Sequence, residues 1–202
     1  MTIEAVVLDI GGVLERTPET GWRDRWAARL GLPRATFDAR LAPVARAGSL
    51  GEIDLAEVER RLAAAYGLDD EALAELMDDL WCEYLGSLDE PVAEYFASLR
   101  PRYRTGILSN SFAGAREREQ AAYGFAQMCD AVVYSHEEGV LKPDPRSYAI
   151  VCERLGVVPA RAVFVDDVAA NVDGARAVGM RGILFTDAEG AIEELRGLLQ
   201  AA

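Results

Sequence analysis

The sequence contains very few of several residue types that carry chemistry. Lys142 is the only lysine among its 21 Lys+Arg residues, and His136 is the only histidine. There are three cysteines, Cys82, Cys129 and Cys152. Because their number is odd and their spacing is wide, they match neither a disulfide framework nor a metal-binding motif. We therefore expect reduced thiols.

Long apolar runs are also absent. No stretch approaches the roughly 18–20 apolar residues that a membrane-spanning helix needs. The N-terminal stretch has no basic segment, and Asp9 interrupts its first apolar run, so it does not resemble a signal peptide. These observations predict a cytoplasmic protein without a membrane span.

Positive charge is scarce as well. The chain has 21 Lys+Arg against 34 Asp+Glu, a formal net charge of −13. Such an acidic surface argues against nucleic acid or an anionic membrane as partner, because both are polyanions. It does not exclude a small anionic ligand bound at a local site. With 202 residues, half of them hydrophobic, the chain is long enough for one domain with a small insert and a real core.

Five short apolar runs predict the strands of a parallel sheet. Each run is continuous rather than alternating, which is typical of strands that are covered on both faces. Helical patterns separate the later runs, so the repeating unit is strand–helix–strand and the fold class is α/β. The predicted strands are 5–8, 105–108, 131–134, 162–165 and 182–185, and the predicted helices of this part are 145–155, 169–178 and 188–199.

The first interval between strands is far longer than one crossover helix requires. We therefore predict an inserted helical subdomain at 15–90 and a core formed by 1–14 and 91–202. Within the insert, apolar residues recur at three- and four-residue steps, and glycines, including Gly48, separate the helices. The predicted helices are 22–30, 34–46, 55–66 and 71–85.

Polar side chains follow the ends of the predicted strands. Ligands of open parallel sheets lie beyond the carboxyl ends of the strands, so we expect these side chains to converge at one site. Each of them alone has an ordinary structural explanation, such as a turn or a helix cap. The set is Asp9, Ser109, Asn110, Lys142, Asp166 and Asp167.

In order and spacing, these motifs resemble those of the haloacid dehalogenase superfamily. The matching stretches are Val7-Leu8-Asp9-Ile10-Gly11-Gly12-Val13-Leu14, Ile107-Leu108-Ser109-Asn110, Gly139-Val140-Leu141-Lys142-Pro143-Asp144-Pro145 and Phe164-Val165-Asp166-Asp167. The resemblance implies a Rossmann-like three-layer α/β core with strand order 5-4-1-2-3. It also implies that the helical insert is the small cap of this superfamily.

The resemblance also implies a reaction. The first aspartate of the family is a covalent nucleophile, which is converted to an aspartyl-phosphate that water then hydrolyses. A magnesium ion offsets the repulsion between carboxylate and phosphate, and oxygen ligands suit it. Carried over to this sequence, the resemblance makes Asp9 the nucleophile. It implies that Asp9, the Gly11 carbonyl and Asp167 bind the metal, with Asp166 in support. It implies that Ser109, Asn110 and Lys142 bind the phosphate, and that Lys142 also neutralises the reacting groups.

The sequence departs from the family's phosphatases at Gly11, where most carry a second aspartate that acts as acid and base. Such a group is worth about 10²–10⁴-fold in rate. Three interpretations remain. The protein is a Mg²⁺-dependent phosphatase of a small phosphorylated metabolite with a good leaving group, such as a sugar 1-phosphate, and water, Glu15 or a cap residue replaces the acid. Alternatively it is a 2-haloacid dehalogenase, or a catalytically silent protein that binds Mg²⁺ and phosphate.

The substrate itself is not readable from the sequence. Candidates to face the site from the insert are Arg16, Trp22, Arg23 and Trp26, although Trp22 and Trp26 at helical spacing are more typical of a core. A hinge is expected near 14–17 and 88–91. No heptads or apolar surface stripe are visible, so monomer and homodimer are both open.

Overall fold

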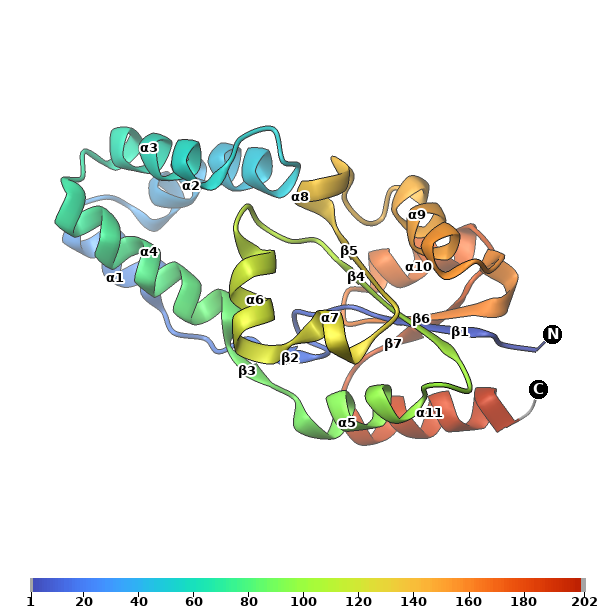
Figure 1. The fold of residues 1–202 in the computed structure, drawn as a ribbon. Helices are drawn as coiled ribbons and strands as arrows, with labels where there is room; N and C mark the ends of the chain where they lie inside the picture. Colours follow the sequence, from blue (N-terminus) through green and yellow to red (C-terminus); the bar gives the residue numbers. More distant parts are fainter. Residues whose placement is uncertain (1, 201–202) are drawn as a thin grey trace.

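A five-stranded parallel sheet forms the centre of the computed structural model, which describes residues 2–200 (Figure 1). Its order is β5-β4-β1-β6-β7, and all neighbours are parallel. Numbered along the chain without the two short strands β2 and β3, these strands read 5-4-1-2-3 from β7 to β5, which agrees with the prediction. Their bounds are β1 (Ala5–Leu8), β4 (Arg104–Ser109), β5 (Ala131–Tyr134), β6 (Ala162–Asp166) and β7 (Arg181–Leu184).

Helices cover both faces of this sheet, as the continuous apolar runs predict. Successive side chains of a strand point to opposite faces. In β1, Val6 and Leu8 therefore pack with helices α5 (Glu90–Ser98) and α11 (Ala188–Gln200), whereas Ala5 and Val7 pack with α9 (Pro145–Leu155) and α10 (Ala169–Ala177). Figure 1 shows the two helix layers on either side of the strands. The predicted Rossmann-like three-layer α/β core is confirmed.

Four further helical segments complete this part of the chain. Two lie between β4 and β5 in the sequence, the third follows β5, and the fourth precedes β6. They are α6 (Ala115–Tyr123), α7 (Phe125–Met128), α8 (Ser135–Glu138) and the 3₁₀ turn η1 (Pro159–Arg161).

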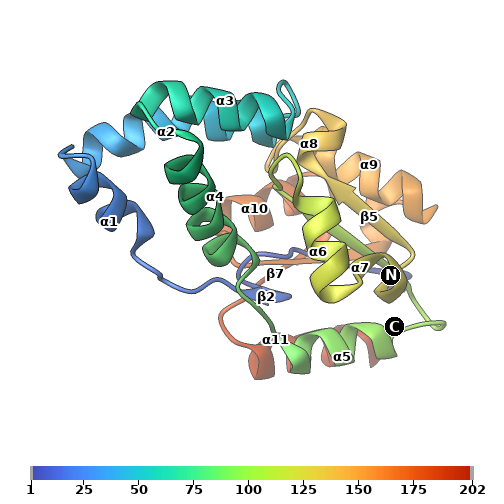
Figure 2. The same ribbon diagram turned by 60° about the vertical axis from the view of Figure 1, so that its left-hand side comes forward.

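A second group of helices follows β1 in the sequence and packs around its own apolar cluster. Phe37 at its centre stacks on Tyr66, with ring centroids 4.7 Å apart. Asp54 and Asp69 act as N-caps, accepting hydrogen bonds from backbone N–H groups three residues on, so the last two helices begin where they do. Figure 2 shows the group lying beyond one end of the sheet. The helices are α1 (Trp22–Arg29), α2 (Arg34–Ser49), α3 (Leu55–Tyr66) and α4 (Asp70–Leu85).

One of these helices corrects the prediction. Gly48 was expected to end a helix, but it lies inside α2, which continues to Ser49. The reason is packing: a Cβ on Gly48 would lie 2.7 Å from a ring carbon of Phe112. Glycine therefore serves a close approach between α2 and the segment after β4, not a turn.

A short antiparallel ribbon joins the helical group to the sheet. It pairs β2 (Glu15–Arg16) with β3 (Ser87–Leu88), and an ion pair of 2.7 Å between Arg16 and Asp89 supports it. Two-residue strands have no periodicity that a sequence can reveal, so the ribbon was not predicted. It coincides with the segments where we expected a hinge.

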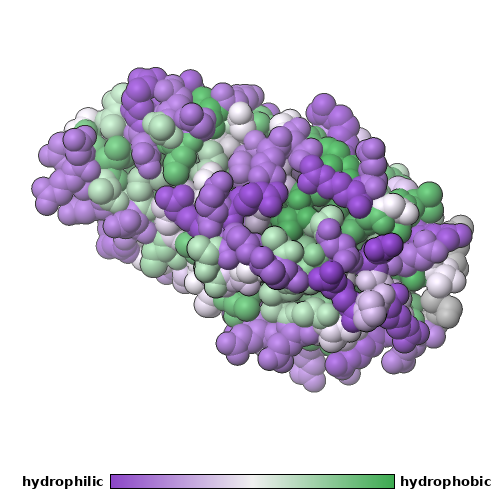
Figure 3. Space-filling model, viewed as in Figure 1, coloured by the Kyte–Doolittle hydropathy of each residue, from purple (hydrophilic) through white to green (hydrophobic). Residues whose placement is uncertain are grey.

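Hydrophilic side chains are spread over the face shown in Figure 3, interspersed with smaller apolar areas. Within residues 2–200, no helix combines the length and the apolar character that crossing a membrane requires.

Candidate active site

The strand order brings the predicted polar residues together. Asp9 follows β1, which lies between β4 and β6, and its neighbours in the register are the ends of those strands. Ser109 ends β4 and Asp166 ends β6, so the three residues leave the same edge of the sheet. The carboxyl edge of the sheet is where ligands bind in this architecture.

Three carboxylates form a compact cluster at this edge. Asp9, Asp166 and Asp167 each offer one carboxylate oxygen, and these oxygens lie within 4.8 Å of one another. Asp9 and Asp166 are buried, and Asp167 is exposed. The donors are all oxygen atoms, which suits a hard cation such as Mg²⁺, and Asp167 leaves the cluster open to solvent. The residues therefore fit a magnesium site.

Lys142 connects two of the carboxylates. Its Nζ lies 2.7 Å from Oδ1 of Asp9 and 2.7 Å from Oδ2 of Asp166, and its side chain is 1% exposed. An ammonium so deeply buried requires carboxylate partners, because an unpaired buried charge is costly. This arrangement explains why an otherwise lysine-free chain has a lysine at this position.

The charge state of Asp9 depends on this arrangement. Burial raises the pKa of Asp9 to about 7; Lys142 opposes this rise and Asp166 adds to it. The backbone N–H of Ile10 donates a 2.8 Å hydrogen bond to the same Oδ1 that contacts Lys142, which fixes the orientation of the carboxyl group. A cation beside the cluster would favour the ionised, nucleophilic form.

The Asp166 carboxylate is held in place by hydrogen bonds from Val168, Asn171 and Lys142. Its Oδ1 accepts hydrogen bonds from the Val168 N–H (2.8 Å) and the Asn171 amide (3.0 Å), and its Oδ2 accepts from Lys142. Asp167 lies against the loop after β1: a Cβ on Gly12 would be 2.3 Å from Oδ2 of Asp167. Gly12 also has φ +73°, so glycine is required there for two reasons.

The structure shows what surrounds Gly11, the position that departs from the family pattern. A Cβ at Gly11 would lie 3.9 Å from Oε2 of Glu15 and 3.9 Å from Oγ1 of Thr17, which is ordinary contact. Glu15 is 1% exposed, accepts a 2.7 Å hydrogen bond from Thr17, and burial raises its pKa to about 7. Among the groups considered as replacements for the missing acid, Glu15 is therefore a titratable side chain that lies beside Gly11.

The loop after β4 differs in part from the prediction. Ser109 is buried at the end of the strand, as expected for a residue of the site. The side chain of Asn110, however, is already engaged: its Nδ2 donates to the Lys142 carbonyl (3.0 Å) and its Oδ1 accepts from the Lys142 N–H (2.7 Å). Asn110 thus positions the lysine loop.

Further contacts at this edge involve residues to which the sequence assigned no role. His136, the only histidine, is half-buried in α8, and its Nδ1 lies 2.6 Å from Oγ of Ser111. Ser135 Oγ accepts from the Ser111 N–H (2.9 Å) and donates to the Ser49 carbonyl (2.8 Å), so it ties α2 to the loop after β4. Isolated serines carry no sequence signal for such contacts.

A cavity of about 260 Å³ lies between the helical group and the loop after β4. Three of its lining residues directly follow Ser109. Trp22 and Arg23, two of the predicted candidates, also line it, whereas Trp26 is buried in the core of the helical group. The lining residues are Thr17, Trp22, Arg23, Leu41, Ala45, Ser49, Leu80, Glu83, Tyr84, Asn110, Ser111 and Phe112.

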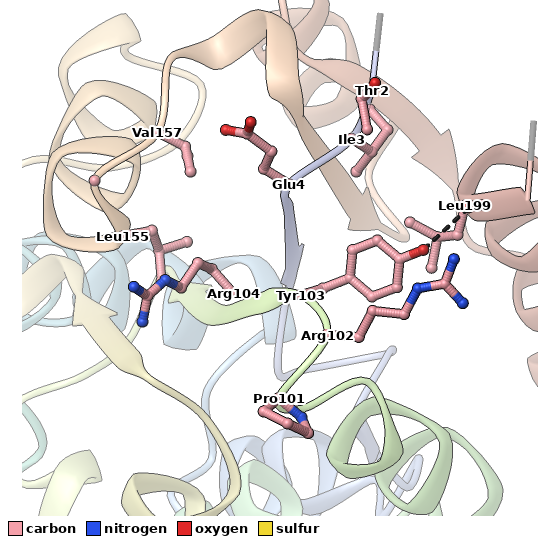
Figure 4. A pocket seen from close by; sticks show the side chains of 11 residues that line it. Thr2, Ile3, Glu4, Pro101, Arg102, Tyr103, Arg104, Leu155, Val157 and Leu199 are labelled. Atoms are coloured by element: carbon pink, nitrogen blue, oxygen red, sulfur yellow. Dashed lines mark hydrogen bonds between the residues drawn. The ribbon is translucent and has the colours of Figure 1, made fainter. Parts of the chain in front are cut away.

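A larger cavity, of about 670 Å³, lies at the opposite edge of the sheet, near the start of β1 and β4 (Figure 4). There the Tyr103 hydroxyl donates a 3.0 Å hydrogen bond to the Leu199 carbonyl, and Arg102 and Arg104 point to opposite sides. The carboxylate cluster lies at the other edge, so this cavity is separate from the candidate active site.

Comparison with known proteins agrees with the geometry. A family model described as haloacid dehalogenase-like hydrolase matches residues 3–179. The chain is 28% identical to "Phosphatase MT3486" of Mycobacterium tuberculosis over 98% of this chain and 96% of that protein. It is 25% identical to a D-ribitol-5-phosphate phosphatase of Bacteroides thetaiotaomicron, over 88% of this chain and 89% of that one. Other matched relatives are longer, and the chain spans 19% of one and 38% of another.

Two further similarities bear on the site. An (S)-2-haloacid dehalogenase of Xanthobacter autotrophicus is 33% identical, over 59% of this chain and 52% of that protein. A Bacteroides thetaiotaomicron enzyme, solved in complex with magnesium and inorganic phosphate, superimposes with a TM-score of 0.77 over 91% of this chain and 94% of its own, at 20% identity. The latter similarity shows a shared fold.

Proposed function

Because the chain belongs to the haloacid dehalogenase-like hydrolases, we propose that it is a Mg²⁺-dependent hydrolase of small phosphomonoesters that uses Asp9 as nucleophile. The observation that carries the proposal is the buried Lys142 ammonium, 2.7 Å from Asp9 and Asp166, inside a cluster of three carboxylates. Relatives named as phosphatases over nearly the whole chain support it.

The reaction consists of two displacements at phosphorus. In the first, a carboxylate oxygen of Asp9 forms a bond to phosphorus, the bond to the ester oxygen breaks, and the departing alkoxide takes a proton from Glu15 or from water; the water that attacks in the second step returns this proton. In the second, water attacks the phosphoaspartate, which releases inorganic phosphate and restores the Asp9 carboxylate. The net change is one ester bond hydrolysed by one water molecule.

Each neighbouring residue has a role in these steps. Lys142 offsets the negative charge that gathers between Asp9 and the phosphoryl group. Ser109 and the adjacent backbone N–H groups bind the phosphoryl oxygens, and Asn110 holds the backbone of Lys142. Asp9, the Gly11 carbonyl and Asp167, with Asp166 in support, would hold Mg²⁺, which would act as a Lewis acid and neutralise the phosphoryl charge.

We further propose that residues 15–90 act as a cap over a core of 1–14 and 91–202. Two observations support this division: helices α1–α4 have their own apolar cluster, and the β2–β3 ribbon connects them to the sheet. A small phosphorylated metabolite is the expected partner. A monomer or homodimer in the cytoplasm stays a prediction.

The second candidate, a 2-haloacid dehalogenase, has support from Gly11 and from the dehalogenase relative, since a departing halide needs no proton. The carboxylate cluster favours the phosphatase, because a dehalogenase of this family does not require a metal.

The two candidates differ in product and in metal dependence. We expect phosphate release from acetyl phosphate and 4-nitrophenyl phosphate in Mg²⁺, lowered by at least about 100-fold when a chelator replaces the metal. Phosphate and chloride would be measured in parallel, with 2-chloropropionate as the halide substrate. Chloride release that persists in chelator, without phosphate release, would reverse the assignment. Binding of Mg²⁺ and phosphate with no product would indicate a silent protein.

Restoring an aspartate at Gly11 should accelerate the hydrolysis of esters with poor leaving groups. The position is exposed and the atoms nearest to a Cβ there are 3.9 Å away, so the backbone accepts the first side-chain atom of Gly11→Asp without a clash. A positioned acid should raise kcat/KM by about 10–100-fold for an alkyl phosphate, and by much less for 4-nitrophenyl phosphate, whose leaving group needs no proton. Steady-state kinetics on both substrates measure this difference.

Gly12→Asp is the matched control for this variant, because a side chain there meets Asp167 at 2.3 Å and the backbone has φ +73°. It should lose activity on both substrates. An equal gain on alkyl and aryl esters in Gly11→Asp would argue against a missing acid.

A further inference from the structure

We infer that the substrate is the phosphate ester of an apolar alcohol, aliphatic or aromatic, whose carbon skeleton occupies the 260 Å³ cavity beside the loop after β4. The inference rests on the proposed function and specifies its substrate class. It departs from the sugar phosphate that the missing acid at Gly11 suggested from the sequence.

The position of the cavity fits the alcohol part of a phosphate ester. Asn110, Ser111 and Phe112 line it, and they directly follow Ser109, which we assign to the phosphoryl group. Its other walls come from helices α1, α2 and α4 and from the segment before α1. A group attached to the phosphorus through oxygen therefore extends from the carboxylate cluster towards these helices.

Apolar side chains form most of the cavity wall. Trp22, Leu41 and Phe112 are buried, and Ala45 and Leu80 are half-buried with surface facing the cavity. Burying a methylene group against such a wall stabilises a complex, because apolar surface is removed from water. The cavity is slightly smaller than the roughly 300–1,000 Å³ typical of small-molecule sites, so it suits a small skeleton.

Four polar side chains of the wall, those of Thr17, Glu83, Asn110 and Ser111, are already paired within the protein. Thr17 donates to Glu15 (2.7 Å), and Ser111 Oγ lies 2.6 Å from His136. Glu83 accepts hydrogen bonds on both oxygens, from Trp22 Nε1 (3.0 Å) and from Thr20 (2.7 Å to its hydroxyl, 3.0 Å to its N–H).

The side-chain amide of Asn110 is also hydrogen-bonded: its Nδ2 donates to the Lys142 carbonyl, and its Oδ1 accepts from the Lys142 N–H. A sugar would bring several hydroxyl groups to a wall on which these four side chains already have partners. A hydroxyl buried without a hydrogen-bond partner is unfavourable. The wall therefore favours an apolar skeleton over a sugar.

The charges on the wall also argue for an alcohol without a second anionic group. Among residues 2–200, those that line the cavity include two charged side chains, Arg23 and Glu83, and their formal charges cancel. Arg23 is exposed, and its guanidinium carbon lies 5.4 Å from the centroid of the Trp22 ring. Burial raises the pKa of Glu83, but hydrogen bonds from Thr20 and Trp22 outweigh this effect and lower the pKa overall. The Glu83 carboxylate therefore stays charged. The phosphate is then the only charged group of the substrate.

The test compares primary alkyl phosphates whose leaving groups are chemically similar. We expect kcat/KM for 2-phenylethyl phosphate to exceed that for glucose 6-phosphate and ribose 5-phosphate by at least about tenfold. Acetyl phosphate, which has almost no skeleton to place in the cavity, reports the basal activity. If acetyl phosphate is hydrolysed but the sugar phosphates equal or surpass 2-phenylethyl phosphate, the inference is wrong and the phosphatase assignment stands. If no phosphate ester or anhydride is hydrolysed, both are wrong.

Two variants of the wall sharpen this test. Ala45→Phe fills the cavity and should lower the ratio of kcat/KM for 2-phenylethyl phosphate to that for acetyl phosphate by about tenfold. Leu80→Gln keeps the size of a half-buried side chain, places a free amide in the wall and should shift the preference towards glucose 6-phosphate. Ala42→Phe, on the exposed side of α2, is the matched control and should change neither ratio. Unchanged ratios in both wall variants would overturn the inference.

Discussion

Replacing Asp9 by asparagine is expected to lower kcat/KM for every phosphate ester by at least about 10³-fold. Asparagine has nearly the same shape as aspartate, so it can keep its place beside Lys142 and Ile10, but its amide cannot attack phosphorus. Because Asp9 is 8% exposed and burial raises the pKa of its carboxyl group to about 7, a neutral side chain there should not unfold the protein. Phosphate release and thermal unfolding, measured on the same preparation, separate the two effects.

The matched control is Asp173→Asn, because Asp173 is an exposed aspartate that pairs only with Arg176 on its own helix. This variant should retain wild-type kinetics. A second readout is direct: rapid acid quenching of the wild-type enzyme during turnover should trap a phosphoryl group on the peptide that contains Asp9. Substantial turnover by Asp9→Asn, or a trapped phosphoryl group elsewhere, would show that another residue is the nucleophile.

The sheet could be predicted from the sequence because burial on both faces leaves a direct compositional trace. The run at 5–8 matches β1 residue for residue, and the run at 131–134 matches β5. Convergence of Asp9, Ser109 and Asp166 followed from the parallel sheet together with the strand order that the family resemblance implied, since adjacent parallel strands end at one edge. Helix α9 was equally clear, because Pro145 stands at its start, where proline is well tolerated.

Contacts between distant segments could not be predicted in the same way. The hydrogen-bond partners of the Asn110 amide depend on the path of the loop that contains Lys142, 32 residues further along the chain. The burial of Glu15 depends on its pairing with β3 in the ribbon, and its position beside Gly11 depends on the turn after β1. Gly48 shows the same limit, since a glycine that packs against Phe112 and a glycine that ends a helix are identical in sequence.

The role of Lys142 is understood from the sequence and the structure together. The sequence marked it because it is the only lysine, and the structure shows the reason: one ammonium contacts two carboxylates at 2.7 Å in a buried site. An arginine would have to fit a planar guanidinium into space that a single nitrogen fills. Lys142 is therefore required by the fold as well as by the proposed chemistry, and its removal should affect both.

Lys142→Met is expected to lower the free energy of unfolding by about 3–5 kcal/mol, because it leaves Asp9 and Asp166 buried without their cation. Arg176→Met, which removes an exposed cation from a surface ion pair, should cost less than about 1 kcal/mol. Urea unfolding of both variants measures the difference. Phosphate release by Lys142→Met should fall by at least about 10²-fold, since the charge at the reacting centre is no longer offset.

The loss of stability in Lys142→Met should depend on pH in a definite direction. Burial already raises the pKa of Asp9 to about 7 in the folded protein, and without the ammonium that opposes this rise the pKa should increase further. The folded state then binds a proton more tightly than the unfolded chain does, so stability falls as the pH rises between the unfolded and folded pKa values. The variant should therefore lie closer to the wild type at pH 5 than at pH 8. A deficit that is equal at both pH values would mean that the lysine stabilises the fold by packing and not by pairing with the carboxylates.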